Sequence, residues 1–168
     1  MADNFEVLHH NKNPEHALLL KVIQPGLAGL MDGSVSTLAP LFAAAFATHQ
    51  VHVAFLVGLS AATGAGISMA FAEGLSDSGE LTGRGNPVIR GLITGFMTFV
   101  GGIFHTVPFL LKNLDSALYL AYLVVGVELV VIAYIRYRFF KMNFILSILQ
   151  VVLGGALVFI AGILIGKS

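Results

Sequence analysis

The sequence predicts an all-α fold, an integral membrane bundle of five helices, from three observations. The chain has 168 residues, of which 57% are hydrophobic and only 11% charged, with a mean hydropathy of +0.88. A soluble domain is nearer a quarter charged. Apolar runs recur five times, each long enough for the roughly 20 helical residues that cross the hydrocarbon of a bilayer. The connections between the runs are short and polar, which favours neighbouring helices that pack together.

A polar N-terminal tail, residues 1–16, precedes one membrane domain, residues 17–166. The tail carries His9, His10 and His16, whose role the sequence leaves open. Because the tail is polar and contains acids, it is expected to be neither a signal peptide nor a transit peptide. The spans are expected at about 17–47, 51–75, 88–111, 117–135 and 144–165.

Prolines and charges suggest where the spans begin, bend and end. Asn13 and Pro14 form a helix start, since Asn is a good N-cap and Pro is tolerated in the first turn. The first span is longer than a bilayer requires, and Pro25 is expected to bend it. Residues 112–116 are expected to form a tight turn and 136–143 a basic turn. Residues 76–87 form the one sizeable polar connection, with Asp77 and Glu80 expected in a solvated loop.

Basic residues predict the orientation, because cytoplasmic connections carry an excess of Lys and Arg. With the N-terminus inside and five spans, the C-terminus lies outside. The cytoplasmic side then holds Lys12, Lys21, Arg84, Arg90, Arg136, Arg138 and Lys141, against Lys112 and Lys167 outside. The arginines beside the spans are expected to extend to the membrane interface.

Composition excludes several classes of function. The chain has no cysteine, which removes disulfides and thiolate chemistry. Formal charge is zero and no basic cluster suggests nucleic acid. No nucleophile–base pair or zinc-hydrolase motif is present, so we expect a protein that is not an enzyme and holds no tightly bound cofactor.

Asp32 is the most informative residue of the first span. A carboxylate at membrane depth is costly, so it indicates function by default. Ser36 lies one turn further on the same helical face. Because Pro40 has no N–H, the carbonyl of Ser36 loses its helical partner. Such oxygen ligands suit a divalent cation; the alternative is an Asp that hydrogen-bonds to Ser or Thr of a neighbouring helix.

Met69 and Glu73 are four residues apart and share one face of the second span. A thioether beside a carboxylate suits Fe²⁺ or another first-row transition ion better than Ca²⁺ or Mg²⁺. Taken alone, Met69 is better explained as a packing residue, and only its pairing with Glu73 makes a metal role an equal alternative.

His105 and Glu128 are the titratable residues inside the third and fourth spans. His105 is a candidate metal ligand, proton relay or hydrogen-bonded core residue. Glu128 has no counter-charge in its own helix, so it would stay neutral until a partner or metal arrives. This makes Glu128, like Asp32, a candidate proton relay and metal ligand, with a hydrogen bond between helices as the alternative.

Glycines four residues apart recur in three spans: Gly29/Gly33, Gly91/Gly95 and Gly162/Gly166. This spacing lets helix backbones approach closely. We expect most of these glycines to serve packing, within the bundle or between two copies.

Several motifs resemble the vacuolar iron transporter family. They are Asp32-Gly33 in the first span, Ile67-Ser68-Met69 followed by Glu73-Gly74-Leu75-Ser76, and the five spans with short loops. Residues 90–108 and the stretch from Glu128-Leu129 to Arg136-Tyr137-Arg138 resemble more closely the membrane domain of bacterial membrane-bound ferritin, an inner-membrane iron exporter. The resemblance covers nearly all of residues 17–166.

The resemblance implies a homodimer of five-helix protomers that moves Fe²⁺, or Mn²⁺, out of the cytosol in exchange for protons. It implies metal translocation by Asp32 and Met69, with Glu73 on the cytoplasmic side. The sequence departs from these relatives at two places. Residues 76–87 stand where the eukaryotic members have a cytoplasmic metal-binding domain, and residues 1–16 are at most a remnant of the ferritin-like domain of the bacterial fusion.

We therefore expect a divalent-metal exporter of the bacterial inner membrane that works by proton antiport. Its metal residues would be Asp32, Met69, Glu73, Glu128 and His105, with Fe²⁺ or Mn²⁺ as substrate rather than cofactor. Its partners would be the lipid bilayer and a second copy. The alternative is a membrane anchor without transport activity that docks a ferritin-like or other soluble partner.

Overall fold

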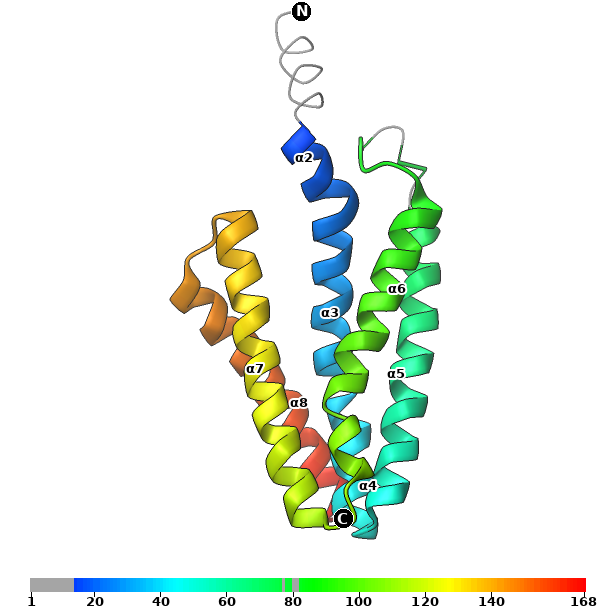
Figure 1. The fold of residues 1–168 in the computed structure, drawn as a ribbon, viewed down its shortest axis with the longest axis vertical. Helices are drawn as coiled ribbons and strands as arrows, with labels where there is room; N and C mark the ends of the chain where they lie inside the picture. The colour runs from blue at the N-terminus through cyan, green and yellow to red at the C-terminus, as the bar shows by residue number, and fades with distance from the viewer. Residues whose placement is uncertain (1–13, 77, 80–81) are drawn as a thin grey trace, which may run out of the picture.

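The computed structural model describes residues 14–76, 78–79 and 82–168. Five helical segments in this part of the chain are long and apolar enough to span a membrane, which confirms the all-α prediction. They begin and end as follows: Pro14–Thr48, which comprises α2, η1, α3 and α4; α5, Val51–Gly74; α6, Pro87–Phe104; α7, Leu114–Phe140; and α8, Phe144–Gly166. α2 and the C-terminus lie at opposite ends of the bundle (Figure 1). His9, His10, Asp77 and Glu80 lie outside the described residues.

The first span is helical throughout but irregular at two places. α2 covers Pro14–Leu18, where the described residues begin, and takes in three residues of the predicted tail. The predicted cap, Asn13, lies outside the described residues. A π-helical turn, η1 (Leu19–Ile23), follows, and α3 (Gln24–Ser36) begins directly before Pro25. A proline collides with the carbonyl four residues earlier. The wider π turn lies where that collision would occur, so Pro25 marks an irregularity in the helix, as predicted.

The second irregularity is a break at Thr37, between α3 and α4 (Leu38–Thr48). Thr37 lies between the two helices with φ −87° and ψ −12°. The break comes one turn before Pro40, which cannot donate to the carbonyl of Ser36. The helical hydrogen bonds resume with the Leu41 N–H donating to the Thr37 carbonyl at 3.2 Å.

Three predicted boundaries in the second half of the chain are wrong. α6 ends at Phe104, and a 3₁₀ turn, η2 (Val107–Leu110), occupies the end of the expected third span, since proline disfavours helical backbone in the residue before it. The expected tight turn is the start of α7, capped by Asn113, whose side chain accepts from the Ser116 N–H. The expected basic turn is largely the last part of α7, which ends only at Phe140 and is capped by Lys141 with φ +53°.

Glycines join α3, α5 and α6 into one tightly packed layer. A Cβ on Gly29 or Gly33 would overlap the carbonyl of Thr94 or Thr98 on α6. On a neighbouring face of α6, a Cβ on Gly95 would lie 2.5 Å from the Gly66 carbonyl oxygen of α5. The backbones therefore touch without side chains between them, as predicted for this spacing.

α8 packs in the same way on α4. A Cβ on Gly162 would lie 2.9 Å from the Ala39 Cα, and one on Gly166 2.9 Å from the Ala43 Cα. The third predicted glycine pair thus also serves helix packing within the bundle.

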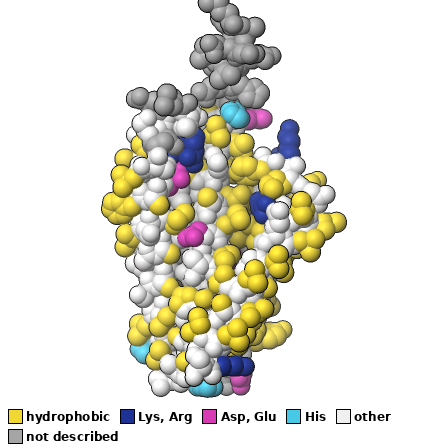
Figure 2. All heavy atoms as spheres, turned by 180° about the vertical axis from the view of Figure 1, so that it is seen from behind, with side chains coloured by type: hydrophobic (Ala, Val, Ile, Leu, Met, Phe, Trp, Pro, Cys, Tyr) yellow, Lys and Arg dark blue, Asp and Glu magenta, His cyan; other side chains and the backbone are white. Residues whose placement is uncertain are grey.

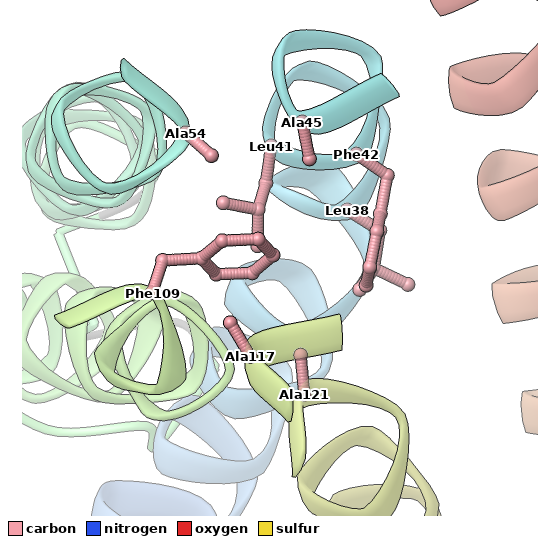
Figure 3. Close-up of a cluster of buried hydrophobic side chains, with 8 residues drawn as sticks. All are labelled: Leu38, Leu41, Phe42, Ala45, Ala54, Phe109, Ala117 and Ala121. Carbon is pink, nitrogen blue, oxygen red and sulfur yellow. The ribbon is translucent and has the colours of Figure 1, made fainter. Parts of the chain in front are cut away.

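A hydrophobic cluster packs α4, α5, η2 and α7 together (Figure 3), toward the end of the bundle away from α2 (Figure 1). Phe109 of η2 and Leu41 of α4 extend into its centre, and Phe42 stacks against the Tyr122 ring at a centroid distance of 5.4 Å. Its buried residues are Leu38, Leu41, Phe42, Ala45, Ala54, Phe109, Ala117 and Ala121. Small alanines on α5 and α7 let the larger side chains of α4 and η2 fill the space.

The outer surface is largely apolar. Figure 2 shows hydrophobic side chains over much of one face, with most of the charged groups toward the two ends of the bundle. Exposed residues include Phe71, Phe96, Tyr119, Ile145 and Leu164, each more than 60% exposed. Such a surface suits lipid, because bilayer hydrocarbon does not expel apolar side chains as water does.

Candidate functional site

Asp32 lies half-buried in α3, next to the glycine contact with α6. Among the described residues it makes neither a hydrogen bond nor an ion pair. The predicted alternative was a hydrogen bond between Asp32 and a Ser or Thr of a neighbouring helix. It is therefore wrong for the described part of this chain. Ser36, one turn on, is exposed. α3 thus presents a carboxylate and a hydroxyl at its surface, next to the break at Thr37.

Met69 lies half-buried in α5 at nearly the same height as Asp32. The glycine contacts fix this relation, because α6 touches both neighbours: Gly33 lies against Thr98, and Gly95 lies against Ala70. The contacts also show that α3 runs parallel to α6 and α5 antiparallel to it. Asp32, one residue before Gly33, and Met69, one before Ala70, therefore differ in height by about one residue, roughly 1.5 Å. The structure brings the carboxylate and the thioether to one level of the bundle.

Glu73 is held by two arginines at the end of α5. Its Oε1 accepts from the Arg84 Nη2 at 2.7 Å and from the Arg90 Nε at 2.9 Å. Arg90 also donates to the Ser76 hydroxyl at 3.2 Å. Arg90 is only 1% exposed. The expectation that it extends to the membrane interface is wrong, because the partly buried Glu73 carboxylate supplies its counter-charge at the bundle.

Thr37, His105 and Glu128 form a buried chain of hydrogen bonds at the break in the first span. The Thr37 Oγ1 lies 2.7 Å from the His105 Nε2, and the His105 Nδ1 lies 3.0 Å from the Glu128 Oε2. Thr37 and His105 are at most 1% exposed and Glu128 is 6% exposed. The chain joins the first span, the end of α6 and the middle of α7, so Glu128 has the hydrogen bond between helices that was its alternative interpretation.

The protons of this chain can be counted. The Thr37 hydroxyl donates to the Gly33 carbonyl at 2.8 Å, so it accepts from a protonated His105 Nε2. Then either His105 Nδ1 is also protonated and Glu128 is a carboxylate, or Nδ1 is bare and Glu128 is a carboxylic acid. In both cases His105 and Glu128 share one proton and the pair is neutral overall, which limits the cost of an acid at this depth.

The predicted metal residues do not gather into one cluster. Among the residues that the structure describes, no group of three or more His, Asp or Glu could hold a metal ion. Asp32 and Met69 share a level, Glu73 lies one turn further along α5 with its arginines, and His105 and Glu128 pair with each other. Both ring nitrogens of His105 are engaged, and Glu128 retains one buried oxygen, Oε1, without a partner.

Sequence reasoning missed Thr37, Arg84 and Arg90 as partners of these acids. A signal for Thr37 was present, because it follows Gly33 by four residues and precedes Pro40, where a helix break is expected. For the arginines there was none, since their distance from Glu73 depends on how α5 and α6 pack.

Comparison with known proteins adds one result. No curated protein matches the chain, and no solved structure matches it. The model of the VIT family matches residues 74–167, a region that includes Arg90, His105 and Glu128 and begins directly after Glu73. This match covers more than half of the chain and agrees with the five apolar helices and the acids inside them. The protein therefore belongs to the VIT family, a family of membrane metal-ion transporters.

Proposed function

We propose that the protein exports divalent transition metal, Fe²⁺ or Mn²⁺, from the cytosol in exchange for protons. The observation that supports this most directly is Asp32, a carboxylate in the first span without a partner among the described residues. A charged group at such depth is costly unless it serves a path for ions or protons.

Met69 supplies the preference for a transition ion. Its thioether lies at nearly the same height in the bundle as Asp32, about one residue of helical rise apart. A hard carboxylate combined with a soft thioether favours Fe²⁺ over Mg²⁺ or Ca²⁺. Glu73 lies near the α2 end of the bundle and would bind the ion first. Its carboxylate would have to separate from Arg84 and Arg90 to do so.

Protons would enter through the same carboxylate. A ligand must be deprotonated to hold metal, so protonation of Asp32 from the outer side would release the ion. His105 and Glu128 already share a proton and would act beside this path as a proton relay. Both ring nitrogens of His105 already make hydrogen bonds, so we assign the metal to Asp32 and Met69 instead.

A second copy of the chain would complete the path. Asp32 is half-exposed on the surface of one protomer, and one carboxylate with one thioether leaves most of the coordination of a metal ion to other groups. In a two-fold dimer the same face meets itself, which would bring a second Asp32 and Met69 to the ion.

Uptake of Fe²⁺ or Mn²⁺ into proteoliposomes that contain the full chain tests the proposal. The wild type should move metal into the vesicles and protons out of them, so that the external solution becomes more acidic. Asp32→Asn and Met69→Leu should lower the rate at least about tenfold, since the loss of even an indirect partner of a metal ligand costs that much.

Matched controls repeat each chemical change elsewhere. Asp115→Asn removes an exposed acid at the start of α7, and Met142→Leu removes an exposed methionine beyond its end; both should transport as the wild type does. Wild-type protein that moves no metal would point to the alternative, an anchor for a soluble partner. Normal transport by Asp32→Asn would refute the assigned residues.

A further inference from the structure

A cleft opens between the first span and the end of α7. The two diverge toward the N-terminal end of the bundle and approach each other toward the opposite end (Figure 1). The cleft has a volume of about 440 Å³. It is lined by Glu15, His16, Leu18, Leu19, Ile23, Arg138, Phe139 and Lys141. None of the residues assigned to metal transport lines it.

The walls of the cleft combine two kinds of surface. Leu18, Leu19 and Ile23 form an apolar wall on the first span, and Phe139 faces them from α7. Beside Phe139 lie two cations, on the last turn of α7 and at its cap. A ligand that fits must therefore be apolar over one part and negatively charged at the other.

The two cations are not neutralised within the described chain. Arg138 contacts the Phe139 ring at 5.6 Å from its centroid but forms no ion pair with any described residue, and neither does Lys141. Arg84 and Arg90, at the same end of the bundle, share Glu73 instead. Glu15 is the only acid among the lining residues, so the two cations leave the cleft with a positive charge.

The position of Lys141 is fixed by the backbone. Lys141 caps α7 in the left-handed conformation, with φ +53°, and its N–H donates to the Arg136 carbonyl. Arg138 lies in the helical turn just before it. The two charges are thus placed at one rim of the cleft by the way the helix ends.

We propose that this cleft binds the headgroup and upper acyl chain of one anionic phospholipid. The phosphate would lie between Arg138 and Lys141, and the chain against the apolar wall of the first span. The volume is in the range of sites for small organic ligands, so the remainder of the lipid would stay in the bilayer. Basic pockets between helices on the cytoplasmic side are known to take acidic headgroups, and the excess of positive residues predicts that this end is cytoplasmic.

A second copy of the chain fits this cleft less well. In a two-fold contact the same surface meets itself. The Arg138 and Lys141 pairs of both copies would then be brought together, which like charges oppose. An anionic lipid supplies the opposite charge and the apolar part in one molecule.

Native mass spectrometry of the full chain in detergent tests the proposal. Phosphatidylglycerol and phosphatidylethanolamine with the same acyl chains are added at equal concentration, and the bound amounts of each are compared. The wild type should retain phosphatidylglycerol in preference. In Arg138→Gln/Lys141→Gln its affinity should fall about thirtyfold, because each basic residue near the surface contributes a factor of roughly five.

Two further variants separate charge from shape. Lys112→Gln/Lys167→Gln removes two cations at the other end of the bundle and should keep the preference. Leu19→Trp keeps Arg138 and Lys141 but fills the cleft, and should reduce the binding of both lipids. Equal retention of the two lipids by the wild type, or an unchanged preference in Arg138→Gln/Lys141→Gln, would overturn the proposal. Since the readout is lipid binding, it is independent of metal transport.

Discussion

His105 and Glu128 illustrate what a carboxylic acid needs inside a membrane. Glu128 lies in the middle of α7, and its Oε2 meets the His105 Nδ1 at 3.0 Å. The shared proton keeps the pair neutral, and Thr37 occupies the other ring nitrogen. Removing one member would leave its partner buried among apolar groups, which costs more than the pair itself contributes.

We therefore expect His105→Ala to lower the free energy of unfolding by roughly 3–5 kcal/mol, the usual cost of breaking a buried pair. Glu128→Gln keeps a hydrogen-bonding group beside His105 and should cost about 1 kcal/mol. Thermal and denaturant unfolding of the purified protein in detergent measures both. His52→Ala, at an exposed histidine of α5, is the control and should change stability little; a stable His105→Ala would contradict the pairing.

At the scale of helices, the glycine contacts decide how close α3, α5 and α6 lie. Gly33 lies against the Thr98 carbonyl so closely that a methyl group has no room. Gly126 of α7, in contrast, has no atom within 4 Å of where its Cβ would be. The two glycines are both helical, so they offer a matched comparison.

Gly33→Ala should push α3 away from α6 and destabilise the protein by roughly 1–3 kcal/mol, as overpacking does. Gly126→Ala should be neutral or stabilise by about 0.5–1 kcal/mol, because alanine favours helix more than glycine. Unfolding midpoints in the same detergent compare the two. Equal effects of both substitutions would mean that the α3–α6 contact is looser than the structure has it.

The helices could be predicted from the sequence more fully than their ends. Apolar length places all five spans, and glycine spacing identifies three close contacts, because both signals are local. The start of α7 at Leu114 and its end at Phe140 were missed, since charged residues such as Arg136 and Arg138 were interpreted as a turn. A helix that leaves the hydrocarbon continues as a helix until a cap ends it.

The candidate site was predictable residue by residue, but not its pairing. Asp32 and Glu128 stand out because charge in an apolar run is costly. The pairing of Glu128 with His105 and of Glu73 with Arg90 depends on how different helices pack. The two residues of each pair are 23 and 17 residues apart in sequence, respectively. No spacing rule within one helix encodes such contacts.

For the whole molecule, an odd number of spans would place α2 and the C-terminus on opposite sides of a membrane. Because the chain has no cysteine, single cysteines can report this directly. In right-side-out membrane vesicles, an impermeant maleimide should label Ser116→Cys and Ser168→Cys. Ser78→Cys should be labelled only after detergent is added, since positive residues place that loop inside. The reverse pattern would invert the predicted orientation.

The break at Thr37 has a mechanical consequence. The first span belongs to two groups of helices: α3 is packed by glycines against α6, and α4 is packed in the same way against α8. Contacts without side chains leave little freedom to slide, so each half of the span is bound to its own neighbours. Thr37 is then the joint between one body, α3 with α6, and a second body, α4 with α8. α5 bridges the two, because Gly66 lies against α6 and Ala54 packs with α4. A rocking motion between the two bodies would turn at Thr37, where the hydrogen bond to His105 is made.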